Sequence, residues 1–430
     1  MRTALILSPH FPPSTLAGVH RARHLAKGLP LHGWRPVVLH ADPRDYEEPG
    51  DPALADLVPD SVEQVAVRLM PAALTRPFGV GDIGLRGFRA YGHALRKAAA
   101  KFHPDVVLLT GSPFYPFLLS SMVRDTLGLP VVLDFQDPWV SDEGRRRQKW
   151  TKPWASHKLA EQLEPRAVRH ASAITSVSET QNEQMRARYP DLRDIPMAAI
   201  PIGGDPDDFD ALRRAPPQNP NHRLEPGKFH LSFVGTYMPR TEPVMNRVFE
   251  AVRMLRDRDP GLADRVRLNF VGTSNQPGPV AHPGPVSGLA RQWGISDMVS
   301  ETPGRVPFLE ALSILANSDG ILLVGSDEPH YTASKIYPAL MSGRPYASVF
   351  HAASSANGVL RSAGGGIALS FDGEAELAGL APAIADAVEI HLNQSEVSKA
   401  DPSAYSDYTA VGVAGAFADL FSNVAPHTHP

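Results

Sequence analysis

The chain contains no cysteine, and this absence removes several kinds of site from consideration. A protein without cysteine has no disulfide framework, no thiolate metal ligand and no cysteine nucleophile. A reducing, cytoplasmic compartment agrees with this composition. The 17 histidines show no H-E-x-x-H or similar spacing, so the sequence predicts no metal site.

Long apolar runs are missing as well. No run approaches the roughly 18 residues of a transmembrane helix. The run Ala4–Leu7 is too short for the core of a signal peptide, and we expect it to form a first strand. The formal net charge of −4 argues against a nucleic-acid partner that needs an overall basic surface. Gly364–Gly366 does not form a G-x-G-x-x-G motif after a strand, which argues against a dehydrogenase.

The pattern of the 430 residues predicts two α/β domains. Short apolar runs alternate with helical periodicity on both sides of a polar, proline-rich stretch, and this alternation is typical of parallel sheets built from βαβ units. The predicted helices include Ile83–Phe102, Tyr115–Leu127, Glu242–Arg258 and Glu374–Leu392. We therefore predict a first doubly wound, Rossmann-like domain at 1–210, a linker at 211–228 and a second such domain at 229–400. Residues 401–430 are predicted as a helix that packs back on the first domain, followed by a frayed tail.

The stretch Ser326–Pro345 predicts a place to hold phosphate. It follows the apolar run Gly320–Val324, a predicted buried strand, and leads into a helix predicted at Ser334–Met341. Ser334 and Lys335 would then lie on the first turn of that helix, where free N–H groups, the helix dipole and the lysine attract an anion. An ordinary strand-to-helix connection with Ser334 as N-cap is the alternative.

Further landmarks occur in a fixed order along the chain. They are the loop and helix Ser8–Ala26, the D-x-x-D-x-W strand end Val131–Trp139, the pair Ile174–Glu179 and Ile200–Asp205, the strand ends Phe233–Thr236 and Phe270–Gly272, and Val306–Glu310 before the Ser-Lys stretch. In this order they resemble the GT-B glycosyltransferases, and most closely the retaining, nucleotide-sugar-dependent enzymes of glycosyltransferase family 4. The resemblance implies two Rossmann-like domains facing across a cleft, with the acceptor bound by the first and the donor by the second.

The resemblance also implies roles for individual residues. The implied donor-binding residues are Gly18, Gly235, Thr236, Arg240, Glu328, Ser334, Lys335 and Tyr337. The implied acceptor-binding residues are Arg21, Asp137 and Trp139. The implied catalytic residues are Asp137, His10, Arg240 and Lys335.

Four of these residues also have an ordinary structural interpretation. Gly18 could be an unremarkable loop glycine, and His10 could be structural. Asp137 could cap the turn before Pro138, and Arg240 could be a surface arginine.

The chain departs from the family pattern at the donor site. Thr236 stands where the family has an arginine, and Arg240–Glu242 spans the position of its lysine. Pro338 replaces a second acid that binds the nucleotide ribose. These departures leave three functions open: a glycosyltransferase, a nucleotide-sugar epimerase of the same fold, and a non-catalytic relative.

Sugar transfer from a nucleotide sugar requires charge stabilisation at the departing diphosphate. Aspartate pairs occur at Asp205 and Asp207, Asp208 and Asp210, and Asp257 and Asp259, but two lie at the linker and one in a helix tail. We therefore expect a metal-free route that uses Arg240, Ser334 and Lys335, and no cofactor besides the donor substrate.

The segment Arg145–Lys158 combines six cations with Trp150 and Trp154. Tryptophan among cations suits the interface of an anionic membrane or a lipid-diphosphate acceptor of the kind used in bacterial polysaccharide synthesis. The segment therefore predicts peripheral membrane contact at the cytoplasmic face. A solvated loop leading into a helix is the alternative, and nucleic acid is disfavoured because no basic track continues elsewhere.

Overall fold

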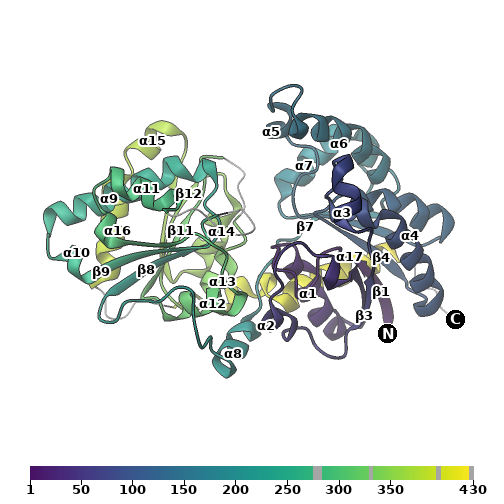
Figure 1. Ribbon diagram of the computed structural model, residues 1–430, viewed down its shortest axis with the longest axis horizontal. Coiled ribbons are helices and arrows are strands. Elements are labelled where there is room, and N and C mark those ends of the chain that lie inside the picture. The colour runs from purple at the N-terminus through teal and green to yellow at the C-terminus, as the bar shows by residue number, and fades with distance from the viewer. Residues whose placement is uncertain (275–282, 329–332, 394–398, 426–430) are drawn as a thin grey trace. The chain divides into compact units, whose positions relative to one another are not determined.

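The computed structural model describes residues 1–274, 283–328, 333–393 and 399–425. The chain divides into two units, of which the first comprises Met1–Gly203 with the segment that begins at Ala410, and the second comprises Gly204–Thr409. Each unit carries one parallel sheet and its own helices (Figure 1). None of the helices in the described ranges combines the length and the apolar character that a membrane crossing requires.

The first unit is built on a seven-stranded sheet in the order β3-β2-β1-β4-β5-β6-β7. Its strands are β1 (Arg2–Leu7), β2 (Trp34–Ala41), β3 (Glu63–Val67), β4 (Val106–Gly111), β5 (Val131–Phe135), β6 (Ala173–Ser176) and β7 (Met197–Ala199). Its helices are α1 (Val19–Gly28), α2 (Pro52–Ala55), α3 (Ala72–Thr75), α4 (Ile83–Phe102), α5 (Asp142–Arg145), α6 (Lys152–Val168), α7 (Glu179–Arg188) and α17 (Ala410–Val424).

The second unit is built on a six-stranded sheet in the order β10-β9-β8-β11-β12-β13. Its strands are β8 (Phe229–Val234), β9 (Val266–Val271), β10 (Val299–Thr302), β11 (Gly320–Val324), β12 (Tyr346–His351) and β13 (Gly366–Phe371). Its helices are α8 (Pro206–Arg214), α9 (Glu242–Arg258), α10 (Leu262–Arg265), α11 (Pro285–Gln292), α12 (Phe308–Asn317), α13 (Ile336–Met341), α14 (Ser355–Ala363), α15 (Glu374–Ala378) and α16 (Ala381–Asn393).

Both sheets reverse their strand order at one point, between β1 and β4 in the first unit and between β8 and β11 in the second. The predicted pair of doubly wound domains is thereby confirmed. Open parallel sheets bind ligands beyond the carboxyl ends of the strands at such a point. The loops that follow β1, β4, β8 and β11 are therefore where functional side chains are expected.

The inner strands β1, β4, β5 and β6 of the first sheet are buried on both faces, which explains their largely apolar sequences. Leu5 and Leu7 of β1 belong to one hydrophobic cluster, whereas Ala4 and Ile6 belong to another on the opposite face. Helix α17 supplies much of this second cluster, and it lies beside α1 in Figure 1. The last helix of the chain therefore covers an apolar face that the first 203 residues leave incomplete.

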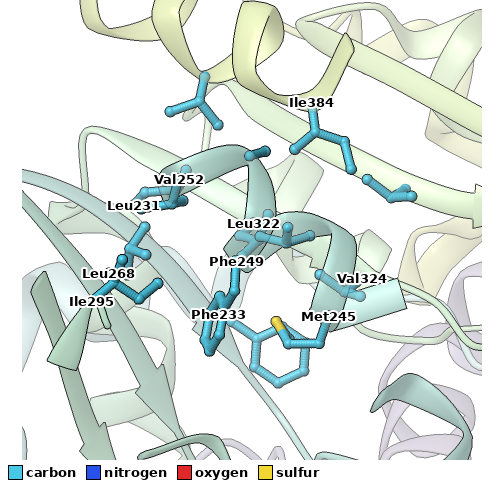
Figure 2. Close-up of a cluster of buried hydrophobic side chains, with 14 of the residues drawn as sticks. Leu231, Phe233, Met245, Phe249, Val252, Leu268, Ile295, Leu322, Val324 and Ile384 are labelled. Atoms are coloured by element: carbon cyan, nitrogen blue, oxygen red, sulfur yellow. The ribbon is translucent and has the colours of Figure 1, made fainter. Parts of the chain in front are cut away.

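In the second unit, helices α9 and α16 bury the sheet. Figure 2 shows Phe233 and Leu268 of the strands against Met245 and Phe249 of α9 and Ile384 of α16. All five side chains are almost completely inaccessible to solvent. Phe233, near the carboxyl end of β8, is therefore held in place by this core.

The stretch predicted as a linker, 211–228, differs from that prediction. It lies within the second unit and begins inside helix α8. Farther along, His222 is buried: its Nδ1 lies 2.9 Å from Thr302 Oγ1, and its Nε2 lies 3.2 Å from Asn269 Oδ1. Asparagine and threonine satisfy the imidazole, so this polar sequence is attached to the sheet instead of being solvated.

Two predicted helices are divided in the structure. Tyr115–Leu127 forms a 3-10 helix at Tyr115–Leu119 and a π-helical turn at Met122–Thr126. The segment 374–392 forms α15 and α16, which are separated near Gly379. The separation follows from Pro382, which lies near the start of α16, where a missing N–H costs no helical hydrogen bond.

Candidate active site

Lys335 lies at the carboxyl edge of the second sheet, next to the end of β8. Its Nζ lies 3.9 Å from the centroid of the Phe233 ring, and its side chain runs beside Gly235. Gly235 has a φ of 137°, which only glycine adopts readily. The side chain of Lys335 makes no hydrogen bond or ion pair with a described residue. Desolvation lowers the pKa of Lys335 to about 7, although the residue as a whole is only partly buried.

Arg240 lies at the same edge, between β8 and α9. Its Nε is 2.6 Å from Asp327 Oδ1 and 3.8 Å from Glu328 Oε1. The backbone N–H of Asp327 also donates to the carbonyl of Arg240. The structure therefore joins two predicted donor-site residues, Arg240 and Glu328, through an aspartate that sequence reasoning missed. The sequence feature that could have identified Asp327 is the acidic pair Asp327 and Glu328, shortly after the buried strand β11.

The helix predicted from about Ser334 begins two residues later in the structure. Helix α13 begins at Ile336, and Ser334 makes no side-chain capping bond to it. The helix is six residues long, so any dipole at its start is weak. The anion-binding capacity of this connection therefore depends on the Lys335 ammonium.

Two further donor-site predictions have different outcomes. Tyr337 is almost fully buried and packs on Tyr408, with 5.3 Å between the ring centroids. This packing gives Tyr337 a structural role and corrects the prediction that it binds the donor. Thr236 is half-buried in the loop that follows β8, where it stays a candidate.

In the first unit, His10 lies just beyond the end of β1. Its Nδ1 is 3.2 Å from Ser14 Oγ and 3.4 Å from Glu48 Oε1. Ser14 also donates a hydrogen bond to Glu48. Desolvation would raise the pKa of Glu48, but the bonds from His10 and Ser14 lower it to about 2. Sequence reasoning missed Glu48, which no local motif distinguishes from Glu47.

Gly18 stands at the start of α1, against the ends of two neighbouring strands. A Cβ added to Gly18 would lie 3.4 Å from Gln136 Oε1 and 3.8 Å from the carbonyl oxygen of Ser112. These are ordinary contact distances, so packing alone does not require glycine here.

Asp137 and Trp139 follow β5 at the same edge. Asp137 has no hydrogen-bond partner among the described residues. The residue is exposed, although the surrounding protein desolvates its carboxyl group enough to raise the pKa. Trp139 stacks on Phe114, with ring centroids 5.6 Å apart, and also contacts Tyr115 and Phe117. Asp137 therefore stays available to a ligand, whereas the indole of Trp139 is largely occupied in packing.

Arg21 does not reach the surface, which corrects its prediction as an acceptor-binding residue. It is fully buried, and its Nε lies 3.1 Å from Asp134 Oδ2. The guanidinium also donates to the carbonyl oxygens of Ile200 and Pro201. It therefore holds the end of the first unit to β5 and α1. The sequence does not show whether an arginine one turn into a helix points to the surface or into the protein.

The aspartate pairs proposed and rejected as metal ligands have local partners. Asp205 caps α8, and Asp210 pairs with Arg213. Asp257 and Asp259 pair with Arg253 and Arg265. Their charges are thus used in turns and surface ion pairs.

Comparison with known proteins assigns the first unit. Residues 17–203 match the family model described as the glycosyl transferase 4-like domain. Over residues 17–203, this match confirms the resemblance to family 4 glycosyltransferases that the ordered motifs predicted. A comparison with curated proteins finds no match by sequence.

Solved structures match over nearly the whole chain. A glycosyltransferase from Rickettsia africae ESF-5 is 14% identical, with 99% of each chain covered and a TM-score of 0.55. A UDP-forming α,α-trehalose-phosphate synthase from Burkholderia xenovorans is 13% identical, with 99% of each chain covered and a TM-score of 0.63. A UDP-GlcNAc 2-epimerase from Methanocaldococcus jannaschii is 15% identical, with 98% of this chain and 100% of that chain covered and a TM-score of 0.51. At these identities the likeness establishes the GT-B fold.

Proposed function

Because the chain carries a glycosyl transferase 4-like domain on a GT-B fold, we propose that it transfers a sugar from a nucleoside-diphosphate sugar to an acceptor with retention of configuration. The observation that carries this proposal is the Lys335 ammonium, held on Phe233 beside Gly235 at the point where the second sheet reverses its order. A cation that has no acidic partner within the described part of the chain, at this edge of the sheet, suits a diphosphate.

The chemical demand in this reaction is the negative charge that grows on the departing diphosphate. Lys335 would donate to a phosphate oxygen directly, as a compact point charge. Arg240, whose Nε is bound to Asp327, would add positive charge at the same edge. Two cations of this kind perform the neutralisation for which other transferases use a metal, and we therefore propose a metal-independent reaction.

Asp137 and His10 are the proposed polar contacts in the acceptor unit. Both follow central strands of the first sheet, at its carboxyl edge. Asp137 offers an exposed carboxylate that can accept a hydrogen bond from a sugar hydroxyl.

We propose that the acceptor is lipid-linked and that the first unit contacts an anionic membrane, as the basic segment 145–158 predicts. Trp150 is 88% exposed, and its ring lies 5.3 Å from that of Trp154. Leu74 in the short helix α3 is 67% exposed, and Phe78 just after that helix is 84% exposed. All of these residues lie in loops or helix starts at the carboxyl edge of the first sheet, where an acceptor would bind. An apolar and cationic surface there fits a lipid diphosphate and the cytoplasmic leaflet that holds it.

An epimerase is the second candidate, because a UDP-GlcNAc 2-epimerase shares the fold over nearly the whole chain. Epimerisation needs acid and base groups crowded around the sugar, whereas the carboxylates of Asp327 and Glu328 at this edge are engaged with Arg240, and the group beside Gly235 is the Lys335 side chain. A non-catalytic nucleotide-sugar-binding protein is the third, since Thr236 and Pro338 depart from the family pattern.

The first experiment is a thermal-shift screen of the full chain with UDP-, GDP- and dTDP-sugars, in which the bound nucleotide raises the unfolding temperature. Release of free nucleotide on adding an acceptor indicates transfer. A changed sugar that stays attached to its nucleotide indicates epimerisation. Binding of a nucleotide sugar without either product indicates a binding protein, and no stabilisation by any of the sugars contradicts the proposal.

A further inference from the structure

The loop that carries His10 is hydrogen-bonded to a second loop. The hydroxyl of Tyr46 accepts a hydrogen bond from the backbone N–H of Phe11 at 3.1 Å. The backbone N–H of Asp51 donates to the carbonyl of Pro13 at 2.7 Å. Residues 46–51, which follow β2, therefore fix the position of residues 10–14, which follow β1.

The contacts of His10 fix its tautomer. Both groups near its Nδ1 are acceptors, because Ser14 gives its own hydroxyl proton to Glu48. We therefore assign the ring proton to Nδ1 and a free electron pair to Nε2. The ring also lies on Tyr46, with centroids 5.6 Å apart and planes inclined by 22°. This stacking restricts rotation of the imidazole.

The opposite nitrogen of His10 is open to a ligand. Its Nε2 has no hydrogen-bond partner among the described residues, and the side chain is 13% exposed. Asp82 also lies within electrostatic reach of this ring, and its carboxylate caps α4 through the N–H of Leu85. An acceptor nitrogen at the point where the first sheet reverses its order suits a donor such as a sugar hydroxyl.

We propose that Glu48 is a positioning residue that orients His10, so that Nε2 accepts a hydrogen bond from a sugar hydroxyl of the substrate. This inference rests on the proposed function for the identity of the ligand, but the orientation of His10 by Glu48 does not. Carboxylates that hold a histidine in this way set both its tautomer and its direction, and losing them weakens the histidine's interaction with its ligand.

The adjacent Glu47 supplies a matched control. Its carboxylate lies 2.7 Å from Arg76 and 3.5 Å from Arg86, away from His10. Glu47→Met removes the same charge one residue away without changing the contacts of the imidazole.

The experiment compares Glu48→Met, Glu48→Gln and Glu47→Met in the full chain. Two-bond proton–nitrogen NMR spectra of histidine-labelled protein report the tautomer of His10, whose signals are identified by their loss in His10→Gln. Release of nucleotide from UDP-glucose, GDP-mannose or dTDP-glucose in the presence of acceptor reports turnover.

We expect Glu48→Met to mix the two tautomers of His10 and to lower turnover about tenfold or more, the effect of losing one oriented hydrogen bond. Glu48→Gln keeps an acceptor for Nδ1 and should give an intermediate result, and Glu47→Met should change neither reading. An unchanged tautomer in Glu48→Met overturns the proposal, as does unchanged turnover. If Glu48→Met does not fold, Ser14→Ala combined with Glu48→Gln takes its place. If the parent chain turns over none of the three sugars, the proposed function fails, while the tautomer still decides whether Glu48 orients His10.

Discussion

The ammonium of Lys335 lies over the face of the Phe233 ring, 3.9 Å from its centroid. The ring's negative face attracts the cation, but the surrounding protein removes most of its hydration. The balance leaves the pKa of Lys335 near 7 instead of its usual value above 10. A diphosphate would supply the counter-charge that the site lacks.

Nucleotide-sugar binding should therefore weaken as pH rises from about 6 to 9. The lysine is protonated below its folded pKa of about 7 and neutral above it, and only the protonated form attracts the diphosphate. Titration calorimetry in buffers of different ionisation enthalpy should show proton uptake on binding near pH 7.5. Binding without proton uptake would show that Lys335 does not contact the ligand.

The lowered pKa of Lys335 predicts the opposite pH dependence for the stability of the ligand-free protein. Because the folded pKa of Lys335 lies below the unfolded one, the unfolded chain binds more protons between about pH 7 and 10. The contribution of this lysine to the free energy of unfolding therefore rises with pH through that window. Chemical denaturation of the parent and of Lys335→Met at pH 7 and 9.5 measures it, and an identical pH dependence in the two proteins would contradict it.

Lys335→Ala should weaken nucleotide-sugar binding about 10- to 100-fold while leaving the fold intact, because one charge-assisted hydrogen bond is lost. Calorimetry measures the affinity, and circular dichroism checks the fold. Lys399→Ala removes an exposed lysine of the same unit and should leave the affinity as it is. Equal affinity in Lys335→Ala and the parent would remove this residue from the site.

The double variant Arg146→Gln, Lys149→Gln should float less with vesicles that contain phosphatidylserine. Each cation near an anionic surface contributes about 1 kcal/mol, so the partition coefficient should fall roughly 30-fold. Arg96→Gln, Lys97→Gln removes two exposed cations of α4, toward the opposite edge of the first sheet, and serves as control. If the parent does not float with such vesicles, the membrane proposal is wrong.

Removing one partner of the buried pair Arg21–Asp134 should destabilise the first unit by about 3–5 kcal/mol, because the other charge stays buried without compensation. Thermal unfolding of Arg21→Met measures the effect. Arg213→Met breaks a surface pair with Asp210 and should shift the midpoint little. If both variants shift the midpoint of unfolding by a similar small amount, Arg21 becomes a candidate for ligand binding again.

Several elements were predicted from sequence with their observed bounds, among them Ile83–Phe102, Glu242–Arg258 and Gly320–Val324. In each element, the regular spacing of apolar residues stops at both ends, where residues of another type follow. The local pattern is therefore enough to predict the bounds. The helix Pro206–Arg214 was missed because its polar, proline-started sequence resembles a linker. Asp205 caps its first turn, which was the available signal.

Residue roles were predicted less well than elements. Lys335 and Gly235, both predicted to bind the donor, lie beside each other because both follow strands that meet at one edge of the sheet, and their binding of the donor stays a prediction. Arg21 and Tyr337 were assigned to ligands although their side chains point into the protein. Glu48 escaped notice because it reaches His10 only through the folding of one loop over another.

The sequence alone determined the two α/β repeats and the order of their strands and helices, since period and turn residues are local properties of the chain. The tertiary structure decided which side chains at the sheet edges remain available, because burial and pairing depend on residues far apart in sequence. It turned Arg21 inward against Asp134, and it left Lys335 on an aromatic ring without an acidic partner among the described residues. A charge acquires its chemical role from what surrounds it, and only the folded chain supplies those surroundings.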